Sequence, residues 1–172
     1  MKTRNIVATL VLLFGVYGVA GATGMDMPAA AKPSPGFDHL KSLVGSWEGQ
    51  TPDGKTVKAS YQMVSNGTCL METLDTPDGA NMVTMYHMDG SRLMMDHYCA
   101  MNNVPHMKGT TSADGKTIDF AFVSAGNLTA PTDMHMHGLK VEFEDADHFT
   151  QEWLLRSKGK DQPSVFRFQR AK

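Results

Sequence analysis

Short turn signals recur from residue 52 to residue 160 and cut the chain into segments of strand length. Asn-Gly and Asp-Gly pairs accept positive φ at low cost and are the strongest local signals for β-hairpins. The signals are Pro52-Asp53-Gly54, Asn66-Gly67, Pro77-Asp78-Gly79, Asp89-Gly90, Asp114-Gly115, Ser124-Ala125-Gly126-Asn127, Asp145-Ala146-Asp147 and Lys158-Gly159-Lys160. The intervening segments, about ten in number, predict an all-β chain of antiparallel strands in an up-and-down sandwich or barrel.

Alternation within the segments indicates that each strand has one dry and one wet face. The apolar faces comprise Val57, Ala59, Tyr61 and Met63; Ile118, Phe120 and Phe122; Phe149, Trp153 and Leu155; and Phe166 with Phe168. A closed antiparallel barrel requires this one-sided pattern. We therefore predict an antiparallel up-and-down β-barrel of about ten strands.

One helical segment precedes the strands. Phe37, Leu40, Lys41 and Val44 fall at helical spacing, and Gly45 ends the pattern. We expect a short N-terminal helix followed directly by the first strand, with the barrel domain spanning residues 37–172.

The N-terminus has the layout of a secretory signal. Residues 1–22 hold a positive end, an apolar run and a possible cleavage site at Ala20-Gly21-Ala22. The alternative is a membrane anchor, but the run is shorter than the ~20 residues that a spanning helix needs. We expect export to the periplasm or the medium, with residues 23–36 as a flexible leader.

Composition narrows the range of partners. The net charge is −2 with the two signs interspersed, and no basic stripe favours nucleic acid. No later segment is long and apolar enough for a membrane span. An exported chain permits a disulfide between Cys69 and Cys99. In a meander, however, another strand lies between theirs, which favours free thiols. We expect a monomer or weak dimer.

Two segments place chemically versatile residues on the dry face. In residues 92–99, Leu93, Met95, His97 and Cys99 alternate together; in residues 134–144 the inward set is His135, His137, Leu139, Val141 and Phe143. A bulge at Gly138 would reverse the orientation of the two His-Met pairs. Glu72 is ambiguous, as either an inward carboxylate at a binding site or a solvent residue.

These His and Cys side chains support two interpretations. Imidazole and thiolate suit zinc, copper and iron, and the 14 Met residues would favour cuprous copper. Alternatively, the Met residues only fill the hydrophobic core, and each buried His only forms a hydrogen bond with a neighbouring polar group. Catalysis is not expected, because Asp96 lies on the face opposite His97 and Cys99, so no triad forms.

Residues 43–49, 71–74, 82–87 and 97–99, with Tyr61, resemble an uncharacterised bacterial family of exported lipocalin-like (calycin) proteins. The resemblance spans nearly the whole mature domain and implies a calycin-type barrel whose Gly-x-Trp residue, Trp47, plugs the closed end. Nitrobindin-like haem-binding barrels open similarly and carry their haem His late in the chain. This sequence has His135, His137 and His148 there, and no surrounding motif selects one of them.

Together these patterns predict a non-enzymatic, exported barrel that holds a small, largely apolar molecule in its cavity. The predicted lining residues are Tyr61, Met63, Tyr86, Met95, His97, Cys99, His135, His137 and Trp153. No metal or cofactor is assigned. The alternative is binding of haem, copper or zinc by the cavity His residues.

Overall fold

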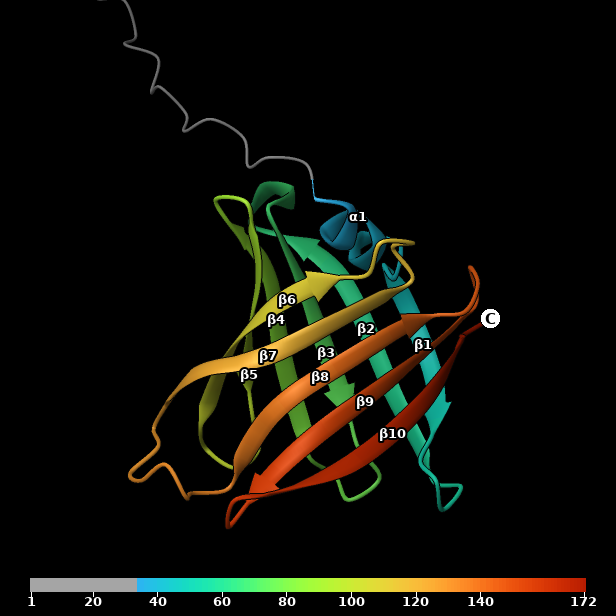
Figure 1. Cartoon of the computed structure of the whole chain (residues 1–172). Helices are drawn as coiled ribbons and strands as arrows, with labels where there is room; N and C mark the ends of the chain where they lie inside the picture. The colour runs from blue at the N-terminus through green and yellow to red at the C-terminus, as the bar shows by residue number, and fades with distance from the viewer. Residues whose placement is uncertain (1–33) are drawn as a thin grey trace, which may run out of the picture.

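Residues 34–172 are described by a computed structural model, in which ten antiparallel strands form a closed barrel (Figure 1). The predicted signal peptide and nearly all of the predicted leader lie outside these residues. Each strand pairs with its sequence neighbours, and β10 pairs back with β1. The strands are β1 (Gly45–Gln50), β2 (Thr56–Val64), β3 (Cys69–Asp75), β4 (Asn81–Asp89), β5 (Arg92–Tyr98), β6 (Val104–Thr111), β7 (Thr117–Gly126), β8 (His135–Phe143), β9 (His148–Ser157) and β10 (Lys160–Arg170). The predicted fold class is confirmed.

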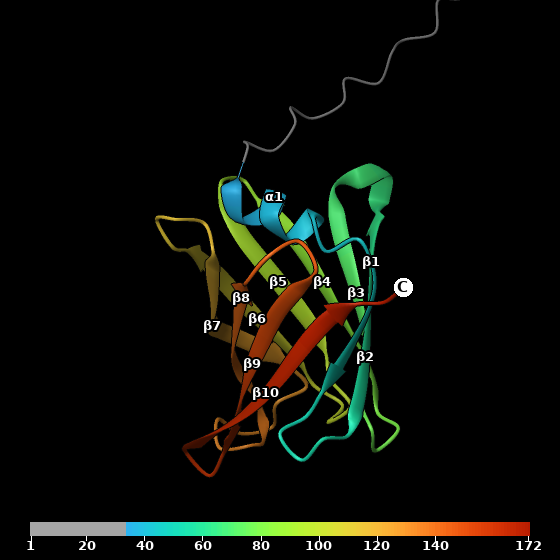
Figure 2. The ribbon, with the colours of Figure 1, turned by 90° about the vertical axis from the view of Figure 1, so that its right-hand side faces the viewer.

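Helix α1 (Pro35–Lys41) covers one end of the barrel, as Figure 2 shows. Ser34 caps the helix by accepting a hydrogen bond from the backbone N–H of Phe37 at 3.4 Å. The helix therefore starts slightly earlier than predicted and includes Gly36, which the sequence had suggested belonged to the leader. A Cβ atom at Gly36 would lie 2.2 Å from Oγ1 of Thr111, so glycine allows this approach to β6 without a shift of the Thr111 side chain.

Trp47 lies directly beneath the helical end. Its side chain is 1% exposed, and its indole N–H donates to the backbone oxygen of Leu43 at 2.7 Å. The ring of Phe149 packs edge-on against it, with the ring centres 4.7 Å apart. This end, covered by α1 and filled by Trp47, is called the closed end below.

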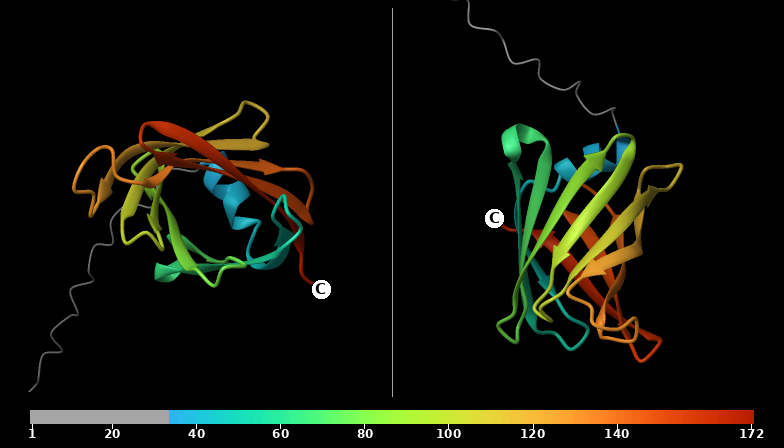
Figure 3. Two further views of the ribbon diagram at one scale, coloured as in Figure 1. Left: turned by 90° about the horizontal axis from the view of Figure 1, so that it is seen from below. Right: turned by 90° about the vertical axis from the view of Figure 1, so that its left-hand side faces the viewer.

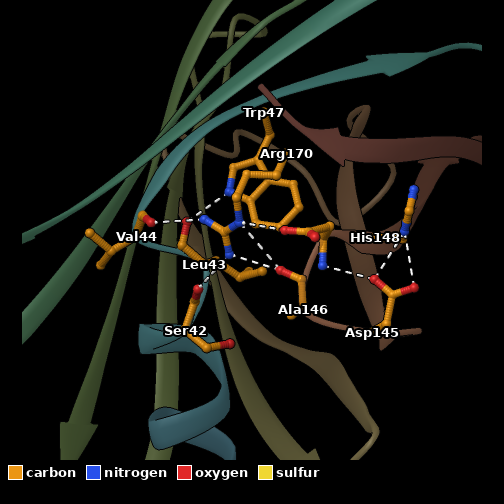
Figure 4. Close-up of polar contacts among 9 residues, drawn as sticks. Ser42, Leu43, Val44, Trp47, Asp145, Ala146, His148 and Arg170 are labelled. Atoms are coloured by element: carbon orange, nitrogen blue, oxygen red, sulfur yellow. Dashed lines mark hydrogen bonds and ion pairs between the residues drawn. The ribbon is translucent and has the colours of Figure 1, made fainter. Parts of the chain in front are cut away.

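Arg170 ties several segments together at the closed end (Figure 4). Its guanidinium carbon lies 4.2 Å from the centre of the Trp47 ring. The side chain also donates to the backbone oxygens of Ser42, Val44 and Ala146 at 3.0–3.2 Å. One residue of β10 thus holds β1, the end of α1 and the β8–β9 turn in place.

The inward faces predicted from alternation are confirmed for β2, β7, β9 and β10. Their buried members are Val57, Ala59, Tyr61, Ile118, Phe120, Phe149, Trp153 and Phe168. The β4–β5 hairpin has the two-residue loop that its Asp89-Gly90 signal predicts, and Gly90 adopts φ 62°. Viewed from below, the strands form a ring with α1 visible within it (Figure 3).

Cys69 begins β3 and Cys99 follows β5, with β4 between the two strands. Both side chains are buried and both thiols are free. Among the described residues, no helix has the length and apolar character needed to cross a membrane.

Candidate functional site

A cavity of about 390 Å³ lies at the end of the barrel opposite α1, called the open end below. Its inner wall is mostly apolar, and its rim comes from the β1–β2, β3–β4 and β5–β6 turns. The wall comprises Leu74, Met82, His97, Cys99, Met101, Met136, Trp153, Leu155 and Phe166; the rim includes Thr51, Asp53, Lys55, Thr76, Pro77, Asp78, Ala80, Ala100 and Ser164. This volume and lining are typical of a small-molecule site.

A larger hollow, of about 1040 Å³, lies outside the barrel along β1, β10 and the C-terminus. Its lining is largely polar and includes Glu48, Arg167 and Lys172. The buried polar side-chain atoms without a hydrogen-bond partner in residues 34–172 belong instead to His97 and Asn103. Because an unpaired buried polar atom needs a partner, the cavity inside the barrel is the stronger candidate site.

His97 is the most unusual residue of the cavity wall. It is 1% exposed, and its Nδ1 lies 2.9 Å from the hydroxyl oxygen of Thr84 on the neighbouring strand β4. Its Nε2 has no partner. Burial lowers the pKa of His97 from 6.5 to about 4, so the imidazole is neutral near pH 7.

The ring of Trp153 packs beside His97, with the ring centres 4.5 Å apart. The indole N–H of Trp153 donates to Oε1 of Gln151 at 3.0 Å, and Gln151 Nε2 donates to Glu72 at 2.8 Å and to the Tyr61 hydroxyl at 2.9 Å. Trp153 therefore connects the cavity wall to a group of buried polar side chains further inside the barrel.

That group, called the polar network below, consists of Tyr61, Glu72, Tyr86 and Gln151. The hydroxyl of Tyr86 donates to the second oxygen of Glu72 at 2.6 Å, so both carboxyl oxygens are paired. Burial raises the pKa of Glu72, against hydrogen bonds from Tyr86, Gln151 and Tyr61 that lower it. The ambiguity at Glu72 is resolved: it faces inward, but it does not line the cavity.

The structure divides the predicted lining residues into two groups. His97, Cys99 and Trp153 line the cavity. The others on regular strands face inward but at a different height: Tyr61 and Tyr86 belong to the polar network, Met95 is buried, and Met63 packs partly buried against the core.

The cavity lining does not include His135 and His137, which the alternation had predicted to face it. The β8–β9 register shifts between Met136 and Gly138, so Met136 pairs with the inward Leu155 and lines the cavity instead. The extra residue of the bulge is His137, and it reverses the alternation that holds from Leu139 onward.

The displaced histidines form their own cluster. Nε2 of His135 lies 3.0 Å from Nδ1 of His137, and His135 Nδ1 lies 2.7 Å from the backbone oxygen of Asp133. The ring of Phe122 packs on both imidazoles, stacked on His137 with the ring centres 4.8 Å apart. Burial, the largest cause, lowers the pKa of His137. His135 and His137 therefore form a hydrogen bond with each other and do not line the cavity.

Sequence reasoning missed several residues of the site. Gln151 alternates with Phe149 and Trp153, so the period of two already placed it inside the barrel. Thr84 was detectable only from the strand pairing that sets it opposite His97. Met82 carried no distinguishing local signal.

No family model and no curated protein sequence matches this chain. Among solved structures, the chain is similar to Rv2717c from M. tuberculosis, with a TM-score of 0.57 and 17% sequence identity. The aligned region covers 82% of this chain and 100% of that chain. The likeness is one of fold. It supports the barrel architecture, which is compatible with ligand binding.

The residues at the cavity do not fit haem well. Of the three His residues predicted for the cavity, only His97 lines it, and its ring packs against Trp153. The volume of about 390 Å³ is near the lower end of the range of ~300–1,000 Å³ for ligand pockets. A small molecule suits this space better than a macrocycle.

Proposed function

We propose that this protein binds a small, largely apolar molecule at the open end, where His97 Nε2 forms a hydrogen bond with the ligand. The observation that carries the proposal is that His97, which lines an otherwise apolar cavity, has a buried Nε2 atom without a hydrogen-bond partner. A buried polar atom without a partner costs about 1–3 kcal/mol, and a ligand with one polar group would remove that cost. Apolar walls with few polar groups are typical of such sites.

The neutral state of His97 indicates what kind of polar group the ligand carries. Because the imidazole is uncharged near pH 7, it does not offer an ion pair to an anion. A hydroxyl or carbonyl group on an apolar skeleton is the matching chemistry.

We propose binding without catalysis, by a monomer or weak dimer. Asp96, the carboxylate beside His97 in sequence, pairs with His106 instead. Cys99, just after the end of β5, lies two positions beyond His97, about 6–7 Å along an extended chain, which is too far for a nucleophile and its base.

We further propose that the chain is an exported, lipocalin-like protein of the periplasm or medium. The support is the layout of residues 1–22, which ends at Ala20-Gly21-Ala22. N-terminal sequencing of secreted material is expected to begin near Thr23. An intact Met1 on that material would refute cleavage.

Binding can be measured through Trp153 itself. The chain has two Trp residues, and Trp47 lies at the closed end, so Trp47→Phe leaves an indole only at the cavity wall. Titration with the neutral probe N-phenyl-1-naphthylamine is expected to quench Trp153 emission saturably. Unchanged emission throughout the titration would count against the proposal.

A matched pair of variants localises the probe. Leu155→Trp fills the cavity and is expected to abolish binding, read as probe fluorescence, whereas Leu154→Trp alters the opposite face of the same strand and is expected to preserve it. Equal binding by both variants would place the probe outside the cavity.

A further inference from the structure

Sulfur-containing side chains from three segments line the cavity of the open end. Met82 comes from β4, Cys99 follows β5, Met101 lies in the β5–β6 turn and Met136 comes from β8. Thiolates bind both monovalent copper and zinc, whereas thioethers are soft donors that favour monovalent copper over zinc, magnesium or calcium. The sequence distributes its 14 Met residues throughout the chain, but the fold brings these three to one cavity together with a free thiol.

The strand register sets two of these donors opposite each other. Val83 pairs with Tyr98, so the next step of the β4–β5 register places Met82 opposite Cys99 on the inward face. Cβ atoms of directly opposite residues lie about 4.5–5.5 Å apart, a separation that lets one ion contact both sulfur atoms.

His97 supplies a nitrogen donor on the same face. Nδ1 is held by the Thr84 hydroxyl, and Nε2 is buried and unpaired. The contact with Thr84 orients the ring, and in the tautomer whose Nδ1–H donates to the Thr84 hydroxyl, Nε2 presents its lone pair to a metal. The site therefore has an oriented ligand as well as soft donors.

We propose that the wall formed by Met82, His97, Cys99, Met101 and Met136 binds a monovalent soft cation, Cu(I). On binding, the Cys99 thiol releases its proton to solvent and the thiolate bonds to the metal. The resulting Cu(I)–thiolate unit has no net charge, so an apolar cavity accepts it without the cost of burying an ion.

The carboxylates at the rim do not favour a harder metal. Asp53 accepts a hydrogen bond from Thr51 and pairs with Lys55, and Asp78 accepts one from Thr76. In residues 34–172 there is no group of three His, Cys, Asp or Glu side chains placed to hold a metal. Selectivity for Cu(I) over Zn²⁺ therefore follows from the thioethers.

The test is an anaerobic titration of the purified full chain with Cu(I), in competition with bathocuproine disulfonate. We expect one Cu(I) per chain, with Ag(I) competing for the site and Zn²⁺ not. Cys99→Ser should lose this stoichiometric binding, and the matched Cys69→Ser should retain it. Binding that survives Cys99→Ser, or that Zn²⁺ displaces, would overturn the inference.

Paired Met variants test the thioethers without emptying the core. Met82→Leu and Met136→Leu keep the side-chain volume and should each weaken Cu(I) binding by about tenfold or more. Met63→Leu and Met88→Leu, which alter Met residues outside the cavity, should leave it unchanged. Equal effects of all four changes would contradict the assignment.

This inference shares the cavity with the proposed apolar ligand but does not depend on it. Saturating Cu(I) should displace N-phenyl-1-naphthylamine if both occupy the same space. Probe binding without Cu(I) binding would refute only the metal site, and Cu(I) binding without probe binding would refute only the proposed function.

Discussion

His97 carries a neutral imidazole at pH 7 because burial lowers its pKa to about 4. The pKa in the unfolded chain is near 6.5, so the folded state binds this proton less readily than the unfolded state does. The contribution of His97 to stability is therefore complete above pH 6.5 and is lost as the pH falls through 4. The integrated loss is about 3 kcal/mol.

We predict that His97→Gln, which cannot titrate, flattens the acid side of the stability curve between pH 6.5 and 4. Urea unfolding of both proteins across this range provides the measurement. The unfolding free energy of the wild type should fall more than that of the variant as the pH is lowered from 6.5 to 4. Parallel curves would show that His97 binds a proton equally in both states.

Glu72 has the opposite dependence on pH. Its folded pKa is raised by burial, so its contribution to stability is complete below about pH 4.5 and is lost as the pH rises through the folded pKa. Relative to Glu72→Gln, the wild type should lose up to about 1.4 kcal/mol per pH unit within that window. Unfolding of the two proteins at successive pH values checks this, and a constant difference would refute it.

At the scale of elements, the closed end depends on a few side chains that connect α1 to the strands. Trp47 fills this end, and Trp47→Ala is expected to lower the unfolding free energy by about 3–5 kcal/mol. Denaturant unfolding followed by circular dichroism measures the loss. Wild-type indole emission like that of free Trp would contradict its buried position.

Arg170 allows a sharper test of the same end. Arg170→Lys keeps the charge but loses the planar fork that donates to Ser42, Val44 and Ala146, and should cost about 1–2 kcal/mol. Amide hydrogen exchange in residues 38–44 should accelerate. Arg167→Lys, at an exposed position on the same strand, is the control and should change neither.

Elements also show what alternation predicts and what it does not. The period of two gave the correct face for His97, Cys99 and Trp153, because β5 and β9 keep a regular register over these residues. It did not predict that Met136 lines the cavity in place of His135 and His137, because the register of β8 shifts between Met136 and Gly138. The sequence indicated Gly138 as a bulge candidate but did not determine whether the bulge forms.

The sequence pattern also did not predict how far along the barrel axis each inward-facing side chain lies. Tyr61, Tyr86 and Met95 face inward as predicted, yet they lie outside the cavity. Alternation specifies whether a side chain points in or out, whereas the register of neighbouring strands and the barrel tilt set its depth. A single sequence therefore predicts which side chains point into the barrel more readily than it predicts which of them lie at the depth of the cavity.

For the whole molecule, we predict that folding needs no disulfide. Cys69 and Cys99 are buried free thiols separated by β4. Protein purified without reductant should show slow reaction with Ellman's reagent when folded and two reactive thiols per chain in denaturant. Fewer than two thiols in denaturant, restored by reductant, would demonstrate a bridge.

A barrel closed at one end by α1 and Trp47 also has a kinetic consequence. Any molecule held at the open end arrives and departs between the same three turns, at residues 51–55, 76–80 and 99–103. A competing ligand then has no second route into the cavity by which to displace the bound molecule. The exchange rate of a bound molecule should be the same at any competitor concentration, because the movement of those turns alone sets the residence time.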